Sequence, residues 1–242
     1  MEGSIVKLPD IIRLKKKYKC YLYLDEAHSI GALGDHGRGV LELFKCNPQD
    51  VDILMGTFTK SFGSVGGYIA GSKKIIDHVR ANSHCTVYGA SMSPPIAMQT
   101  FAALSSIMGR GFSNDGQKRI RKLRWNTQYF RHELLKRGFI VYGNRESPIV
   151  PLILFHPYKI PHFSDDLLAK GVAVVIVGPP ATPLQTCRAR FCLSSNHTKA
   201  MLDKVIKAID QVGDELNLKC SRKPLHIMRE IQQGEPGPEP LD

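Results

Sequence analysis

The residue best suited to covalent chemistry in this chain is Lys60, which lies in the segment GTFTKSFGSVGGY, residues 56–68. A lysine amine can form a Schiff base with a carbonyl compound, and in its uncharged form it can act as a base. A lone lysine after a strand is more often a solvated surface group. Lys60, however, stands among hydroxyls and glycines, which can hold a phosphate through hydroxyl and backbone N–H donors. The segment therefore indicates a reactive lysine beside an anion-binding loop.

A second polar cluster, Asp25-Glu26-Ala27-His28, follows an apolar stretch at 21–24. Helicases of the DEAH type use these four letters to hold Mg²⁺ for ATP hydrolysis. That class also needs a G-x-x-x-x-G-K-[ST] loop and downstream helicase motifs, which this sequence lacks. Pyridoxal phosphate enzymes instead need a carboxylate that keeps the pyridine nitrogen protonated, together with a lysine. The combination of Asp25 with Lys60 favours this second class.

Both clusters need a sheet to position them. The apolar runs 21–24 and 51–55 predict buried strands that lead to Asp25 and Thr57, and 67–70 predicts a third strand. Helices are expected over 8–18, 40–44, 73–82 and 94–108. Strands alternating with helices indicate an α/β domain with a parallel or mixed sheet, whose ligands bind at the carboxyl ends of strands. We therefore expect Asp25, Thr57 and Lys60 at one sheet edge.

The second half of the sequence predicts a smaller α+β domain. A polar linker at 109–117 precedes a long basic helix over 118–137, and a closing helix carries an apolar stripe that includes Leu202, Ile206 and Ile209. Further elements are expected as strands near 139–142, 149–155, 172–177 and 189–193 and as a helix near 165–170. The predicted divisions are 1–115 for the first domain, 116–217 for the second and 218–242 for a disordered tail.

Composition narrows the classes of partner. The formal net charge of +11 attracts anions without choosing among them. The six cysteines contain no C-x-x-C pair, so we expect a reducing compartment and no metal site. No stretch approaches the roughly 20 apolar residues of a membrane-spanning helix. We expect no nucleic-acid partner and no transmembrane segment in this chain.

The segments LDEAHSIGALGDHGRG and GTFTKSFGSVGGYIAG together resemble the α-oxoamine synthases. These are fold-type I pyridoxal phosphate enzymes that condense an amino acid with an acyl-CoA and release CO₂. Within the family the chain is most similar to the lysine-bearing long-chain-base subunit of the eukaryotic serine palmitoyltransferases, from Met1 to about Pro224. The resemblance implies the C-terminal part of the large mixed-sheet domain of a fold-type I transferase, followed by a smaller α+β C-terminal domain.

The resemblance also implies roles for four residues of the first domain. Lys60 would carry pyridoxal 5'-phosphate covalently and act as the catalytic base. Asp25 would pair with the pyridine nitrogen, and His28 would hydrogen-bond the ring's phenolic oxygen and take part in catalysis. Thr57 would bind the cofactor phosphate.

Two further residues receive roles by the same resemblance. Arg190, in the segment RARFCLSSNHT, would bind the amino-acid carboxylate, for which a planar bidentate donor is suited. On its own, the pattern around Arg190 is more typical of a surface charge at a strand edge. Ser91 lies in a segment that resembles one reaching across the family's dimer interface to the neighbour's cofactor phosphate.

The implied reaction is the decarboxylating condensation of L-serine with a long-chain acyl-CoA to a 3-keto long-chain base, the first step of sphingolipid synthesis. The resemblance implies pairing with a second long-chain-base subunit at the cytosolic face of the endoplasmic reticulum membrane. It also implies that a large part of the catalytic core, with a membrane anchor, precedes Met1, so that this chain alone is expected to be inactive. The alternatives are a truncated non-catalytic isoform that pairs with partner subunits, or another α-oxoamine synthase that uses a different amino acid.

Overall fold

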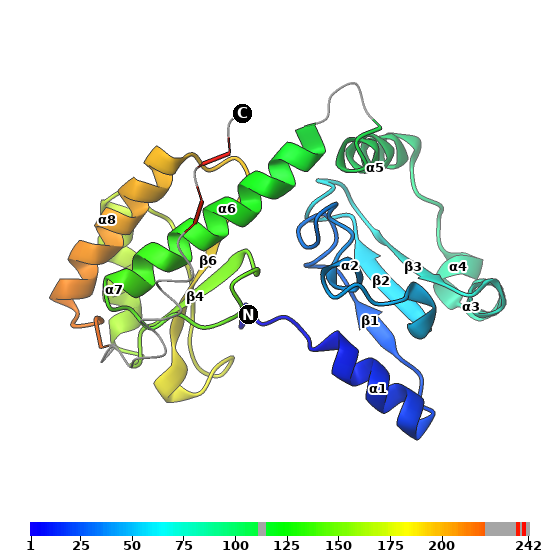
Figure 1. Ribbon diagram of the computed structural model, residues 1–242, viewed down its shortest axis with the longest axis horizontal. Coiled ribbons are helices and arrows are strands. Elements are labelled where there is room, and N and C mark those ends of the chain that lie inside the picture. Colours follow the sequence, from blue (N-terminus) through cyan, green and yellow to red (C-terminus); the bar gives the residue numbers. More distant parts are fainter. Residues whose placement is uncertain (111–114, 221–235, 238, 241–242) are drawn as a thin grey trace. The chain divides into compact units, whose positions relative to one another are not determined.

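The computed structural model describes residues 1–110, 115–220, 236–237 and 239–240 (Figure 1). The chain forms two compact units. One comprises Val6–Ile120, and the other comprises Met1–Ile5 together with Arg121–Asp242. The units divide between residues 120 and 121, whereas the predicted domain division at 115–116 remains a prediction. Each unit is described by itself below.

A three-stranded mixed sheet forms the centre of the first unit. Its strands are β1 (Tyr23–Asp25), β2 (Ile53–Thr57) and β3 (Gly67–Gly71), in the order β1-β2-β3. Strand β1 runs parallel to β2, and β3 runs antiparallel to it. The helices are α1 (Leu8–Tyr18), α2 (Val40–Leu43), α3 (Lys73–Asn82), α4 (His84–Tyr88) and α5 (Pro94–Ile107), and a 3-10 turn spans Pro48–Asp50. The short helix α4 was not predicted; the other helices and the strands lie close to their predicted ranges.

Helix α1 is attached to the end of the sheet from which β1 and β2 start. The Lys15 amine lies 2.7 Å from an Asp52 carboxyl oxygen, just before β2. The same oxygen accepts a hydrogen bond of 2.7 Å from the Leu22 backbone N–H. The hydrogen bond from Lys15, and then that from Leu22, hold the pKa of the Asp52 carboxyl below its ordinary value. This ion pair fixes the strand starts, which leaves the carboxyl ends of the strands for the site.

The second unit is an α+β fold around a three-stranded antiparallel sheet. Strands β4 (Ile149–Ile153), β5 (Val175–Val177) and β6 (Arg188–Cys192) lie in the order β4-β6-β5. Helix α6 (Asp115–Lys136) belongs to this unit from Arg121 onward. Helices α7 (Lys159–Ala169) and α8 (Lys199–Glu215) also accompany the sheet, with a 3-10 turn at Leu184–Thr186. The core of this unit is fully buried at Phe130, Leu134, Phe139, Leu152, Phe163, Ile206, Ile209 and Val212.

Several expected boundaries in this unit were wrong. The segment predicted as a strand over 139–142 forms a single bridge between Val141 and Leu152, flanked by backbone hydrogen bonds of 3.0 Å from Ile153 to Ile140 and 2.9 Å from Tyr142 to Pro151. Phe139 is buried in the core outside this pairing. Pairing in the run 172–177 begins only at β5, and α7 begins at Lys159, before the expected 165. Helix α6 begins at Asp115, inside the expected linker. An apolar run indicates burial, and burial does not require strand pairing.

The only tryptophan of the chain, Trp125, lies in α6. Its ring stacks on Tyr129 with centroids 4.9 Å apart, and its indole N–H donates to the Gly237 carbonyl oxygen at 2.7 Å. Of the predicted tail, Leu218 is buried and Lys219 pairs with carboxylates of α8. Residues 221–235, 238 and 241–242 of that predicted tail lie outside the described residues. No helix in the described part of the chain is long and apolar enough to cross a membrane.

Candidate functional site

The first unit brings Asp25 and Thr57 to the same edge of its sheet. Strands β1 and β2 are parallel, with Asp25 opposite Met55 in the register, so both strands end at that edge. The Glu26 N–H then donates to the Met55 carbonyl oxygen at 2.7 Å, which extends the pairing one residue past β1. The Asp25 carboxyl accepts a hydrogen bond of 2.8 Å from the Ala27 N–H and is exposed. The edge therefore presents a carboxylate whose backbone is fixed.

Lys60 lies on the loop that joins β2 to β3. Phe58 and Gly66 close this loop with a backbone hydrogen bond of 2.9 Å, and the Gly63 N–H donates to the Lys60 carbonyl oxygen at 3.1 Å. Gly63 and Gly66 both have positive φ, +56° and +94°, a conformation that disfavours a side chain. The Lys60 side chain is exposed. The glycines allow the tight loop that holds the Lys60 backbone at this edge.

Two hydroxyls precede the lysine. The Thr57 hydroxyl donates to the Gly66 carbonyl oxygen at 3.0 Å and accepts from the Thr59 N–H at 3.3 Å. The Thr57 and Thr59 hydroxyl oxygens lie 2.8 Å apart. The hydroxyl hydrogen of Thr57, a residue predicted to bind phosphate, is thus used in a hydrogen bond within the loop. Thr59 lies beside Thr57, and its side chain is exposed. Thr59 was not among the predicted site residues, although its hydroxyl lies at the alternate position between Thr57 and the lysine loop.

His28 lies on a turn that contacts the lysine loop. The turn is closed by hydrogen bonds of 3.0 Å from the Ser29 and Ile30 N–H groups to the Glu26 carbonyl oxygen. The Ser61 hydroxyl then donates to the Ile30 carbonyl oxygen at 2.7 Å. The structure therefore joins the segment that bears Asp25 and His28 directly to the loop that bears Lys60.

Helix α5 supports the lysine loop from its other side. The Gln99 amide donates to the Phe62 carbonyl oxygen at 3.2 Å, and the Ser64 hydroxyl donates to the Ile96 carbonyl oxygen at 3.2 Å. Phe62 is buried, with its ring edge-on to Phe58. Ser91 lies between α4 and α5, exposed, and no hydrogen bond joins it to the other predicted site residues in the described part of the chain.

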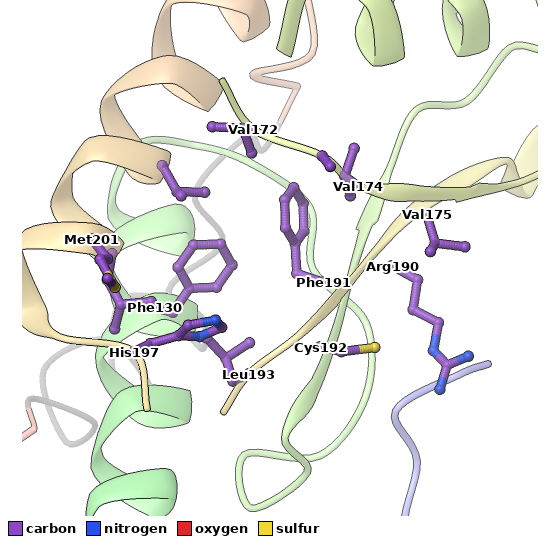
Figure 2. Close-up of a pocket in the computed structure, with 13 residues that line it drawn as sticks. Phe130, Val172, Val174, Val175, Arg190, Phe191, Cys192, Leu193, His197 and Met201 are labelled. Atoms are coloured by element: carbon purple, nitrogen blue, oxygen red, sulfur yellow. The ribbon is translucent and has the colours of Figure 1, made fainter. Parts of the chain in front are cut away.

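Arg190 belongs to the second unit, in the middle of β6, where it stands opposite Pro151 and Val175. An apolar pocket of about 260 Å³ lies beside β6. In Figure 2 the Arg190 guanidinium is directed away from the rings of Phe130 and Phe191, which line this pocket. The Arg190 Nε is buried and has no hydrogen-bond partner among the described atoms. A buried donor without a partner fits a residue that receives an anion.

The neighbouring arginine is engaged by the protein itself. Arg188 is almost fully buried, lies 2.5 Å from a Glu2 carboxyl oxygen and donates to the Thr186 carbonyl oxygen at 2.9 Å. Residues two apart on a strand share a face, so Arg188 and Arg190 point to the same side of β6. Burial, and then the positive charge of Arg190, lower the pKa of the Met1 amino group, which is consistent with the first residues lying near this face.

Comparison with known proteins assigns this arrangement to a class. The sheet edge combines a carboxylate, hydroxyls and a lysine on a glycine-bearing loop. The model of the family "Aminotransferase class I and II" matches residues 1–209, and the chain belongs to that family.

Within this family, the similar proteins of known name include serine palmitoyltransferases. Serine palmitoyltransferase 3 of Homo sapiens is 57% identical over 222 residues, which are 92% of this chain and 40% of the relative. Serine palmitoyltransferase 2 of Dictyostelium discoideum is 51% identical over 219 residues, 90% of this chain and 45% of the relative. The chain therefore spans less than half the length of these relatives.

Solved structures confirm the predicted fold. The Sphingomonas wittichii serine palmitoyltransferase superposes with a TM-score of 0.81 at 27% identity, covering 90% of this chain and 53% of that one. A high-resolution structure of SPT with PLP gives a TM-score of 0.81 at 28% identity with the same coverage. An 8-amino-7-oxononanoate synthase from Francisella tularensis, at 22% identity and a TM-score of 0.74, shows the fold alone. The chain has the fold-type I α/β architecture.

Proposed function

We propose that this chain is the lysine-bearing part of a pyridoxal phosphate-dependent acyltransferase that condenses L-serine with a long-chain acyl-CoA and releases CO₂. The relatives at 50% identity and above are named serine palmitoyltransferases or long-chain-base biosynthesis proteins. The observation that carries the proposal is the joining of the Asp25–His28 turn to the Lys60 loop by the bond from Ser61 to Ile30.

The residues present fit the cofactor. Pyridoxal phosphate, when bound, supplies a ring that delocalises the electron pair released at the amino-acid α-carbon. Lys60 is the amine that would attach it, and the Asp25 carboxylate would hold a proton on the ring nitrogen. The Thr59 hydroxyl, with the backbone N–H groups of the loop, would hold the phosphate, and the Thr57 hydroxyl, which lies 2.8 Å from that of Thr59 and donates to Gly66, would position it.

Lys60, His28 and Arg190 have different roles in the reaction of serine. The Lys60 amine, in its uncharged form, takes the proton from the serine α-carbon, and it can return a proton after CO₂ has left. His28 would hydrogen-bond the phenolic oxygen of the cofactor ring and so help to orient the ring. Arg190 binds the serine carboxylate through two N–H groups, which fixes the serine in one orientation.

A reductive labelling experiment tests the cofactor part of the proposal. The purified chain is incubated with pyridoxal phosphate, reduced with borohydride and digested, and mass spectrometry locates the pyridoxyl group. Selective labelling of Lys60 is the expected result, since Lys73 and Lys74 are also exposed but lie outside the site. Equal labelling of these lysines would contradict the proposal that this chain by itself forms the cofactor site, and the reaction would then be tested by the chimera described below. The variant Lys60→Ala should lose the selective label while keeping the circular dichroism spectrum.

The same proposal includes the substrates, the partner and the cellular location, by similarity to the longer relatives. We propose L-serine and a long-chain acyl-CoA as substrates, a second long-chain-base subunit as partner, and the cytosolic face of the endoplasmic reticulum membrane as the location. A chimera of the human relative that carries residues 1–209 of this chain tests the reaction. It should form a 3-keto long-chain base from serine, and its Lys60→Ala variant should not.

A further inference from the structure

Glu26, the residue after Asp25, is buried at the centre of the site's backbone. Its side chain is 3% exposed. The carboxyl group accepts hydrogen bonds from the Val40 N–H at 3.0 and 3.1 Å and from the Leu41 N–H at 3.3 Å. It also accepts a short hydrogen bond from the Ser29 hydroxyl. The buried Glu26 side chain therefore joins its own turn to the start of α2, which lies 14 residues further along the sequence.

The start of α2 is shaped around this carboxyl group. The residue before the helix is Gly39, which offers no side chain to cap the helix N-terminus and has a φ of +83°. A β-carbon at Gly39 would lie 2.4 Å from a Glu26 carboxyl oxygen. Glu26 thus takes the place of the missing N-cap by accepting the first helical N–H groups. The glycine is what lets the carboxyl group approach.

Glu26 also connects to the reactive lysine through two further bonds. Its carbonyl oxygen closes the turn that carries His28 by accepting from the Ser29 and Ile30 N–H groups. The Ile30 carbonyl oxygen then accepts the Ser61 hydroxyl, next to Lys60. Hydrogen bonds therefore link Glu26 to the lysine loop without a break: the Glu26 carboxyl and carbonyl groups hold the turn at residues 26–30, and Ile30 of that turn accepts from Ser61.

We infer that Glu26 is a positioning residue for the site: by holding the turn that carries His28 against the start of α2, it sets where the Lys60 loop lies relative to Asp25 and His28. This inference rests on the proposed function for the meaning of the site. Glu26 itself does not act on substrate, since its carboxyl group is buried among protein donors.

The chain offers a matched control in Glu42. Its carboxyl group also holds the glycine loop, accepting from the His36 and Arg38 N–H groups at 3.0 and 3.1 Å and lying 2.6 Å from the His36 ring nitrogen. No hydrogen bond connects Glu42 to the His28 turn or the lysine loop within the described residues. Glu42 reaches the His28 turn only indirectly, through the bridge between Arg38 and Ile30, whereas Glu26 is part of that turn and accepts from its Ser29 hydroxyl. Glu26→Gln and Glu42→Gln therefore perturb the same loop, but the first should disturb the site far more.

Two readouts on the full chain test the inference. The first is the share of pyridoxyl label that Lys60 takes after borohydride reduction, together with the absorption maximum of the bound cofactor. The second, which needs no cofactor, is amide hydrogen exchange in residues 26–31 and 58–66. Glu26→Gln should lower the Lys60 share and raise the exchange rates by about ten-fold, the order expected when a hydrogen bond to a charged group is lost. Glu42→Gln should leave the label share and the absorption maximum as in the unsubstituted chain, and its effect on exchange should be confined to residues such as Gly31 that pair with the glycine loop and be smaller than that of Glu26→Gln.

A milder variant keeps the test decisive if Glu26→Gln does not fold. Ser29→Ala removes one donor from the same carboxyl group and should shift both readouts in the same direction by a smaller factor. An unchanged Lys60 share and absorption maximum in a folded Glu26→Gln or Ser29→Ala chain would overturn the inference, as would equal effects of Glu42→Gln. If Lys60 of the unsubstituted chain takes no selective label, the proposal that this chain by itself forms the cofactor site fails, and the exchange comparison alone decides the positioning role.

Discussion

The Ser61 hydroxyl donates a 2.7 Å hydrogen bond to the Ile30 carbonyl oxygen, across 31 positions of sequence. Gly31, with a φ of +77°, makes this approach possible, because a β-carbon there would lie 2.4 Å from the Ser61 β-carbon. The bond joins the two segments whose side chains were predicted, from spacing and resemblance, to form one site. Removing the bond therefore tests the arrangement of the site separately from its chemistry.

We predict that Ser61→Ala lowers the free energy of unfolding by about 1 kcal/mol, the usual net contribution of one hydrogen bond. Urea unfolding followed by far-ultraviolet circular dichroism measures it. Ser93→Ala is the control: Ser93 precedes α5, but its side chain makes no capping bond, so its loss should be below about 0.5 kcal/mol. Equal losses for the two variants would mean that the Ser61 bond adds nothing.

Alanine should be more destabilising at Gly39 than at Gly63 for two reasons, crowding against Glu26 and a backbone conformation at Gly39 (φ +83°, ψ −158°) that is essentially restricted to glycine. Gly39 and Gly63 both have positive φ, but a β-carbon at Gly63 meets only the Gln99 side chain, at 3.9 Å, whereas one at Gly39 meets the fixed Glu26 carboxyl group at 2.4 Å. Gly63→Ala should cost only the left-handed conformation, about 1 kcal/mol. Gly39→Ala should cost clearly more than that in the same urea experiment. A loss at Gly39 equal to that at Gly63 would show that neither the crowding nor the backbone conformation at Gly39 adds to the cost.

Asp203 should give the second unit part of its acid sensitivity. Burial by itself raises the pKa of the Asp203 carboxyl, but the hydrogen bonds from Lys199 and Tyr129 outweigh it, and the pKa lies below the ordinary 3.8. A depressed pKa contributes stability that is present above the unfolded value and is lost as the pH falls through the folded value. Since the side chain is 44% exposed, the contribution is at most about 1 kcal/mol.

The variant Asp203→Asn tests this pH dependence. Its deficit in unfolding free energy, relative to the unsubstituted chain, should be constant between about pH 7 and 5 and should shrink below about pH 4. Urea titrations at each pH, followed by Trp125 fluorescence, measure the deficit. Asp165→Asn, at an exposed position of α7, serves as control and should show no such trend. A deficit that persists unchanged at acid pH would argue against the ion pair as its source.

Arg190→Ala should weaken serine binding by about ten-fold or more, because a charge-assisted hydrogen bond is worth roughly 1.5–3 kcal/mol. The half-saturating serine concentration, followed by the absorption of the chain's bound cofactor, reports it. Arg80→Ala, in exposed α3, removes the same charge away from the site and should leave the serine dependence unchanged. If Arg190→Ala binds serine normally, the carboxylate is held elsewhere.

The sequence predicted those parts of the site that follow from local pattern. An apolar run that ends in Asp25 indicates a strand end, and the parallel pairing of β1 with β2 indeed puts Thr57 at the same edge. The bounds of α1 were predicted from Pro9 and an apolar face. These inferences need only neighbours in sequence, which is why they succeeded.

The parts that the sequence could not predict depend on contacts between distant segments. Glu26 was read only as a member of the acidic pair, because its donors, the Val40 and Leu41 N–H groups, become its neighbours only when the glycine loop folds back. One feature of the sequence could have indicated this role of Glu26: the predicted helix starts after Gly39, which has no side chain to cap it, so another acceptor is needed. Phe139 was assigned to a strand for a similar reason, since its burial comes from packing within the core and not from pairing.

The position of Trp125 makes the two compact units separately observable. This single indole lies in the second unit, stacked on Tyr129, so its emission reports the unfolding of that unit and is silent on Val6–Ile120. Circular dichroism, by contrast, sums over the helices of both. Coincident midpoints from the two signals would identify a single cooperative transition, and separated midpoints would identify two. One emission spectrum and one dichroism curve on the unsubstituted chain thus measure the cooperativity between the lysine-bearing and arginine-bearing units without any label.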